Sequence, residues 1–354
     1  MAEIKSKAGI VYDFAKEEIL WEKAAEEQLP VADLVKLMTG FLAIEKCQDA
    51  AKRFAVSDKE GCARYQSLVN PSCLKPREEV SITDCVKYLL LTSANEAADA
   101  LAVETAGSIS EFCHQMNVKA AELGMENTVF ADPSGLSIIP HHSSAKDLAV
   151  LCKAALSNPL LKEMLFAEEG VLPASNLRSE EFKYENRNVL PGMEDDHDNA
   201  EGDADSSASD DASDDANDCA GNFRVMKTGQ SADAGICLAA HFEKAGAEYA
   251  IVVLGADSEE TAAEDAKALI EECETAAEDA KALAEECEEA ADDVEPEVAD
   301  EQPEQEETAA DPSGLKLTLE DILGVAVSKE ERKKKKEELR KQFLDAGELS
   351  SLNN

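Results

Sequence analysis

Three short segments contain lysine, aspartate, serine, threonine or asparagine, side chains that can carry nucleophilic and acid–base chemistry. In chain order they read LPVADLVKLMT at 29–39, TSANEA at 92–97 and MKTGQS at 226–231. In the first, apolar residues begin to recur at helical spacing from Asp33 onward, so Lys36 should lie one turn later on the same face. A helix N-terminus offers free N–H groups and partial positive charge to a reacting group or an oxyanion. A desolvated lysine beside it can serve as a general base.

In their order and spacing the three segments resemble the D-alanyl-D-alanine carboxypeptidases of the penicillin-binding-protein type, serine hydrolases of bacterial wall metabolism. That family has S-x-x-K at a helix start, then S-x-N, then K-T-G on an edge strand. Further similar stretches lie between and after them: AAELGMENTVFADPSGL at 120–136, HHSSAKDLA at 141–149, NRNVL at 186–190 and AGICLAA at 234–240. The resemblance covers roughly residues 8–257. It implies an α+β fold with an antiparallel sheet flanked by helices, a mainly helical lobe and a cleft between them.

The resemblance also assigns catalytic roles. Lys36 would be the general base, Ser93 would relay a proton to the leaving amine, and Asn95 would orient the substrate backbone and Lys36. Taken alone, Ser93 could be an ordinary helix cap and Asn95 a surface polar residue.

Four further residues would bind the substrate. The resemblance implies that Lys227 and Thr228 bind its terminal carboxylate, that Gly229 lets the strand approach closely, and that the N–H of Gln230 supplies half of the oxyanion hole. Without the other motifs, this segment could be a plain strand end followed by a turn.

The sequence departs from the family at the nucleophile, where Asp33 stands in place of serine. A serine forms a hydrolysable ester, whereas a carboxylate attacking the same amide would form a much less favourable anhydride. Asp33 should also form an i, i+3 ion pair with Lys36, which keeps that lysine protonated and unable to act as a base. Asp33 could instead serve simply as a good N-cap of the helix.

Three functions follow as hypotheses. The first is an acylation-deficient protein that still binds peptidoglycan stem peptides ending in D-Ala-D-Ala, or a β-lactam that mimics them. The second is a working carboxypeptidase in which Asp33 or a water acts directly, and the third is an interaction protein that works through its acidic tail. No cofactor or metal is expected, because the acidic insertion matches no EF-hand loop and His141 and His142 are expected to be surface residues.

The charge of the chain is strongly negative and unevenly distributed. Asp and Glu number 76 against 34 Lys and Arg, giving a formal charge of −42. Segments 194–218 and 258–307 carry −12 and −20 of it. This charge argues against nucleic acid as the main partner. Contact with a membrane would be peripheral at most, through a mixed-charge helix near the C-terminus that contains the basic run Arg332–Lys336.

The pattern of elements predicts one interrupted domain. We expect a hairpin at 8–13 and 18–22, helices at 33–47, 83–106, 109–123 and 144–156, and strands at 223–227, 235–241 and 248–254. The first and last strands should share one sheet. We therefore predict a carboxypeptidase-like domain at 1–257, with a disordered acidic insertion at 194–220.

Residues 258–354 have a different sequence pattern from the predicted domain. Residues 261–274 and 275–288 repeat a fourteen-residue sequence that differs only at Ile270 and Ala284, which predicts an acidic helical segment at 258–293. A linker at 294–312 and a mixed-charge helix at 313–354 should follow. The family works at the cell envelope, but residues 1–7 lack the pattern of a signal peptide, so a cytoplasmic location also stays open. The ten cysteines fit no zinc or redox spacing and are expected to be mostly unpaired.

Overall fold

A computed structural model describes residues 2–47, 49, 51–58, 74–136, 141–193 and 221–292, with side chains to residue 276. Strands β1 (Ala8–Asp13), β2 (Glu18–Lys23), β7 (Asn222–Ser231), β8 (Gly235–Lys244) and β9 (Ala247–Ala256) form one antiparallel sheet in the order β2-β1-β9-β8-β7. The predicted sharing of one sheet by the two ends of the domain is confirmed by the β1–β9 pairing. Because β8 and β9 are buried on both faces, they read as nearly continuous apolar runs.

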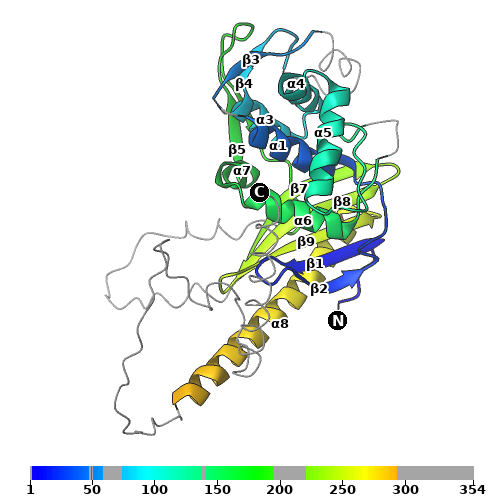
Figure 1. Ribbon diagram of the computed structural model, residues 1–354, viewed down its shortest axis with the longest axis vertical. Helices are drawn as coiled ribbons and strands as arrows, with labels where there is room; N and C mark the ends of the chain where they lie inside the picture. The colour runs from blue at the N-terminus through cyan, green and yellow to red at the C-terminus, as the bar shows by residue number, and fades with distance from the viewer. Residues whose placement is uncertain are drawn as a thin grey trace, which may run out of the picture. The chain divides into compact units, whose positions relative to one another are not determined.

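One face of the sheet packs against the helical part of the chain (Figure 1). Its helices are α1 (Val35–Lys46), α3 (Ile82–Thr92), α4 (Asn95–Ala106), α5 (Ile109–Glu122), α6 (Ala145–Leu156) and α7 (Pro159–Leu165). A 3-10 turn, η1 (Ala32–Leu34), leads into α1. Nine of the twelve residues of α1 are buried, so this helix runs through the middle of the helical lobe and carries Lys36 into the interior.

The opposite face of the sheet is covered by α8 (Glu259–Asp292) (Figure 1). Ala262, Ala266 and Leu269 of the first repeat are buried against β8 and β9. Buried Asp265 accepts hydrogen bonds from the N–H groups of Lys5 and Ser6, at 2.9 and 2.8 Å. The helix predicted after residue 258 therefore forms, and its first copy belongs to the core of the same body as the sheet.

One helix prediction is wrong. Residues 83–106 form two helices, α3 and α4, because Ser93 has φ 59° and ψ 31° and ends α3 in a left-handed conformation. A left-handed residue cannot continue a right-handed helix. The neighbouring helix start was predicted correctly, since the hydroxyl of Ser108 caps α5 by accepting from the N–H of Glu111.

Two small two-stranded sheets went unpredicted. Strands β3 (Arg53–Ala55) and β4 (Glu79–Ser81) pair with each other, and so do β5 (Glu169–Leu172) and β6 (Phe182–Glu185). Short strands of three or four residues carry too little periodicity to be read from sequence. The cysteines among the described residues are free, and all of them except Cys47 are buried.

Several sequence predictions fall outside the described residues. They concern the acidic insertion at 194–220, the linker at 294–312 and the C-terminal helix at 313–354. Among the helices that the structure describes, none combines the length and the apolar character that a membrane span requires.

Candidate active site

The first motif brings Asp33 and Lys36 into direct contact. Lys36 Nζ lies 2.5 Å from Asp33 Oδ1 and also donates to the carbonyl of Ser134, at 2.5 Å. The side chain of Lys36 is fully buried, while that of Asp33 is 30% exposed and reaches the surface of the site. In both contacts the lysine is the donor, and its two acceptors are a carboxylate and a backbone carbonyl.

The backbone around Asp33 is strained and tightly enclosed. Ala32 has φ 45°, a left-handed conformation that an alanine adopts only at a cost of about 1–3 kcal/mol. A Cβ atom on Gly229 would lie 2.7 Å from the amide nitrogen of Asp33. A Cβ on Gly135, where φ is 81°, would collide with the carbonyl of Ala32. Only glycine at 229 lets strand β7 approach the 3-10 turn this closely.

The second and third motifs meet through Lys227. This side chain is fully buried in β7, and its Nζ donates to the hydroxyl of Ser93 at 2.6 Å and to Asn188 Oδ1 at 2.6 Å. Its third contact is the carbonyl of Thr228, at 2.8 Å. All three acceptors are neutral, so this buried lysine has no carboxylate of its own.

The pKa of Lys227 also distinguishes it from an ordinary lysine. Burial lowers the pKa of Lys227 to about 7, and the nearby charge of Lys36 lowers it too, while the charge of Asp33 acts in the opposite direction. The two lysines and Asp33 thus share one electrostatic environment, although they come from η1, α1 and β7. At neutral pH, Lys227 can gain or lose a proton at little cost.

Asn188 joins the site although no role was predicted for it. Its Oδ1 also accepts from the N–H of Thr228 at 3.1 Å, and its Nδ2 donates to the carbonyl of Leu90 at 2.9 Å. It therefore ties β7 to the last turn of α3, which ends at Ser93. The NRNVL stretch gave a sequence signal, but only the folded chain brings it beside Lys227.

Asn95 was predicted to orient Lys36, and the structure describes its place in the fold. Asn95 begins α4, and its Oδ1 is buried without a hydrogen-bond partner among the described residues. No hydrogen bond joins it to Lys36 in that part of the chain. A buried unpaired carbonyl oxygen is a place where a ligand N–H could bind.

Strand β7 is an edge strand and presents backbone groups to the site. The N–H of Thr228 points away from β8, because its acceptor is Asn188. Strand residues two apart direct their N–H groups to the same side, so the exposed Gln230 offers its N–H along this free edge as well. The edge can therefore receive an extended peptide or an oxyanion.

Both histidines that were predicted to be surface residues are half-buried. His142 pairs with Val129 through its backbone, which draws it into the fold. Burial lowers the pKa of His141, and Lys36 lowers it as well, whereas the charge of Asp132 works against them. The prediction of a surface position was wrong because the backbone bridge could not be read from the sequence.

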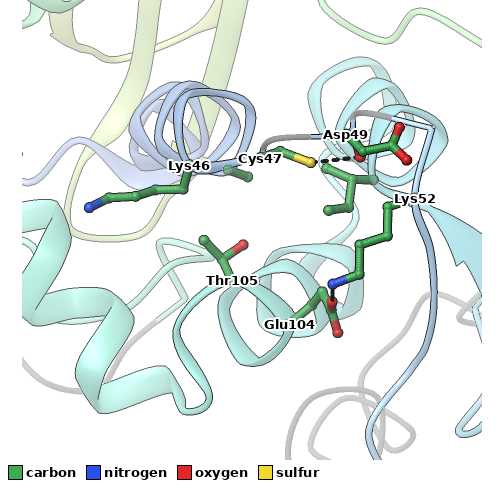
Figure 2. A pocket seen from close by; sticks show the side chains of 8 residues that line it. Lys46, Cys47, Asp49, Lys52, Glu104 and Thr105 are labelled. Carbon is green, nitrogen blue, oxygen red and sulfur yellow. Dashed lines mark hydrogen bonds and ion pairs between the residues drawn. The ribbon is translucent and has the colours of Figure 1, made fainter.

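A separate hollow lies at the far end of α1 (Figure 2). It is lined by Lys46, Cys47, Lys52 and Glu104, among others, and Lys52 pairs with Glu104 at 2.7 Å. Ten helical residues, about 15 Å, separate Lys46 from Lys36. None of the residues predicted for the active site lines this hollow.

Comparison with known proteins gives the site a context. A family model described as D-alanyl-D-alanine carboxypeptidase matches residues 1–202. The D-alanyl-D-alanine carboxypeptidase DacF of Bacillus subtilis is 35% identical over 156 residues, which cover 44% of this chain and 39% of DacF.

Solved structures of penicillin-binding proteins have a fold similar to that of this chain. Penicillin-binding protein 6B of Escherichia coli is 26% identical with a TM-score of 0.60, covering 77% of this chain and 78% of that one. Penicillin-binding protein D2 of Listeria monocytogenes, in its cefotaxime-bound form, has the same fold, with 24% identity, a TM-score of 0.57 and coverage of 77% and 98%. The chain spans only 39% to 60% of the length of the curated relatives it first matches.

Proposed function

Because the chain belongs to the D-alanyl-D-alanine carboxypeptidase family, we propose that it binds the D-Ala-D-Ala end of peptidoglycan stem peptides without forming a serine-type acyl-enzyme. The observation that carries this proposal is the 2.5 Å ion pair between Asp33 and Lys36. This ion pair joins the residue at the nucleophile position to the family's base, whereas the residues proposed for substrate binding take no part in it. The cell envelope, where peptidoglycan lies, is the proposed place of action.

The binding half of the site supports the first part of the proposal. A D-Ala-D-Ala peptide ends in a carboxylate. Buried Lys227 offers a cation to such a group, and the hydroxyl of Thr228, now 3.4 Å from Asn188 Oδ1, could turn to it as a donor. The free edge of β7 offers N–H groups to the peptide backbone. The unpaired Oδ1 of Asn95 is an acceptor for a substrate amide N–H.

The catalytic half supports the second part. A carboxylate in place of the serine hydroxyl would yield an anhydride, which is a far less stable product of attack than an ester. Lys36 donates to Asp33 and to the carbonyl of Ser134, so the family's base is paired with a carboxylate where a serine hydroxyl would give up its proton. Steps that need the side chain at 33 and Lys36 are therefore blocked, whereas steps that need only Lys227 and Ser93 are not.

Relatives with solved structures indicate a suitable probe. The penicillin-binding protein of L. monocytogenes was solved in cefotaxime-bound and ampicillin-bound forms. We extend β-lactam recognition to this chain as part of the proposal. A fluorescent penicillin then reports acylation, and a D-Ala-D-Ala peptide reports reversible binding.

The experiment compares the native chain with Asp33→Ser and Asp33→Ala. We expect a D-Ala-D-Ala peptide, but not its L-Ala-L-Ala isomer, to bind the native chain in calorimetry. Fluorescent penicillin should label Asp33→Ser covalently and leave the native chain and Asp33→Ala unlabelled.

Two results would refute the proposal in different parts. Covalent labelling of the native chain would mean that it is a working hydrolase. Equal affinity for the two peptide isomers, or for neither, would mean that the site does not recognise the family's substrate. If Asp33→Ser also stays unlabelled while folded, more than the nucleophile is missing.

A further inference from the structure

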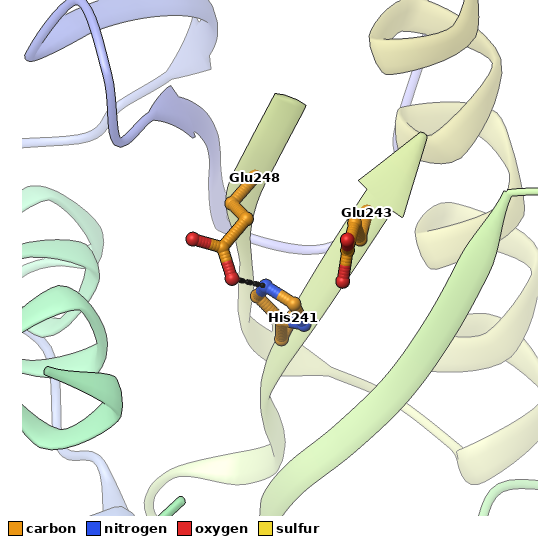
Figure 3. Close-up of side chains that lie close together, drawn as sticks. All are labelled: His241, Glu243 and Glu248. Carbon is orange, nitrogen blue, oxygen red and sulfur yellow. Dashed lines mark ion pairs between the residues drawn. The ribbon is translucent and has the colours of Figure 1, made fainter. Parts of the chain in front are cut away.

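Three potential metal ligands gather on the sheet face that α6 and α7 cover, at the end of the β8–β9 hairpin (Figure 3). His241 and Glu243 are two residues apart on β8, so they share one face of the strand. Glu248 lies directly opposite Glu243 on β9. Figure 3 shows the three side chains directed toward one another.

His241 is the unusual member of this cluster. It is only 1% exposed and lies between the rings of Phe14 and Phe166, whose centroids are 6.0 and 5.8 Å from its own. Neither of its ring nitrogens makes an aligned hydrogen bond within the described part of the chain. Nε2 lies 3.2 Å from Glu248 Oε1, close enough for an ion pair but not aligned as a hydrogen bond. The Nδ1 of this buried imidazole has no hydrogen-bond partner among the described residues, and a buried polar atom of this kind is a place where a ligand can bind.

The donor set has the chemistry of a transition-metal site. One ligand atom from each of the three residues lies within 4.8 Å of the other two. A zinc ion binds imidazole nitrogen and carboxylate oxygen at about 2.0–2.2 Å and commonly takes three protein ligands with one open position. Calcium and magnesium prefer sets made wholly of oxygen.

We propose that His241, Glu243 and Glu248 form a binding site for a zinc-type divalent cation. The ion would satisfy the buried imidazole and pin the β8–β9 hairpin. The site shares no residue with the candidate active site. Lys227 pairs with Ala239, two residues or about 7 Å along β8 from His241.

Lys162 on α7 competes for this site. Its Nζ lies 3.0 Å from Glu248 Oε1, the same oxygen that faces His241. The side chain of Lys162 is 42% exposed, so it can turn outward when an ion arrives. The guanidinium of Arg224 stacks over Phe166, 4.7 Å from the ring centroid. Within the described residues it forms no ion pair with Glu243 or Glu248. Removing the lysine charge should therefore strengthen metal binding.

The test titrates zinc into the full chain and into two variants that should change the affinity in opposite directions. Glu243→Gln removes one ligand and should weaken the tightest binding event by about tenfold or more. Lys162→Met removes the competing cation and should tighten it severalfold. Glu122→Gln is the matched control, because Glu122 also pairs with a lysine, Lys119, but lies on α5.

The many other acids of the chain provide the main alternative. Binding by dispersed carboxylates would give the same isotherm for all variants, and that result would overturn the proposal. X-ray absorption of the loaded chain checks the ligands independently of any variant. A spectrum with imidazole and oxygen but no sulfur supports the site, whereas sulfur ligands or oxygen alone would refute it.

Discussion

The candidate active site contains two fully buried lysines in contrasting surroundings. Lys36 rests against a carboxylate, Asp33, and a backbone carbonyl. Lys227 has three neutral acceptors, and burial lowers its pKa to about 7. One lysine, on α1, is thus an ion-pair partner, whereas the other, on β7, responds to pH.

The two lysines differ in the side chain that accepts from each, which is the carboxylate of Asp33 for Lys36 and the carboxamide of Asn188 for Lys227. A carboxylate supplies the charge that a buried ammonium needs, whereas the carboxamide of Asn188 supplies only a dipole. The half of the site built on α1 is therefore electrostatically complete without a ligand. In the half built on β7, no carboxylate of the described residues bonds to Lys227, and a ligand carboxylate would supply one.

The largest effect is expected from removing the carboxylate of Asp33, just before α1. Asp33→Asn keeps the shape of the side chain but leaves the Lys36 ammonium buried without a counter-ion. We expect a loss of about 3 kcal/mol in the free energy of unfolding, measured with urea. The exposed pair of Glu122 and Lys119 gives the control, since Glu122→Gln should cost far less. Similar losses in both variants would contradict the assigned ion pair.

The next test makes the β7 half resemble the α1 half. Asn188→Asp places a carboxylate 2.6 Å from Lys227 Nζ and should raise the pKa of Lys227 by about one to three units above its present value near 7. Proton titration followed by NMR of labelled lysine measures it. Asn186→Asp is the matched control, because Asn186 contacts Asn188 and, within the described residues, makes no hydrogen bond with Lys227. An unchanged pKa in Asn188→Asp would contradict the role given to the carboxamide.

Ligand binding should depend on pH through the same lysine. Below about pH 7, Lys227 is charged and ready for a carboxylate, and above it the protein must take up a proton to bind. The affinity for a D-Ala-D-Ala peptide should therefore fall as the pH rises, by up to about tenfold per unit. Calorimetry from pH 6 to 9 measures this trend. Lys227→Met should bind more weakly and show no such slope, and a flat profile in the native chain would argue against Lys227 as the anion site.

The smallest effect is expected at Ser93. Ser93→Ala removes one of three neutral contacts of Lys227 and should cost about 1 kcal/mol or less in unfolding free energy. Lys227 keeps Asn188 and the Thr228 carbonyl, so its burial stays satisfied. A loss as large as that of Asp33→Asn would mean that the two halves are not as different as their partners suggest.

Much of the fold was predictable because local patterns were strong. Alternating and continuous apolar runs located the strands of the main sheet, and helical spacing located α1, α5 and α6. The separation of α3 from α4 was not predictable, because it depends on one left-handed serine in an otherwise helical sequence. The two small two-stranded sheets were missed because strands of three or four residues show no clear alternation of apolar and polar residues.

The site was predictable only in part. The motifs named Asp33, Lys36, Ser93 and Lys227, and these four side chains share one electrostatic environment or direct contacts. Asn188 had no predicted role because its importance comes from contacts with residues 40 and 98 positions away. Asn95 was predicted to orient Lys36, but no hydrogen bond joins the two within the described residues.

The sequence by itself determined which chemical groups stand at the motif positions, and above all that a carboxylate replaces the serine hydroxyl at residue 33. It also determined the i, i+3 spacing of Asp33 and Lys36, because a helical turn fixes that distance locally. The tertiary structure decided what each lysine experiences. Burial lowered the pKa of Lys227 and, among the described residues, left the ring nitrogens of His241 without an aligned hydrogen bond. Neither burial nor partners from distant segments can be read from neighbouring residues.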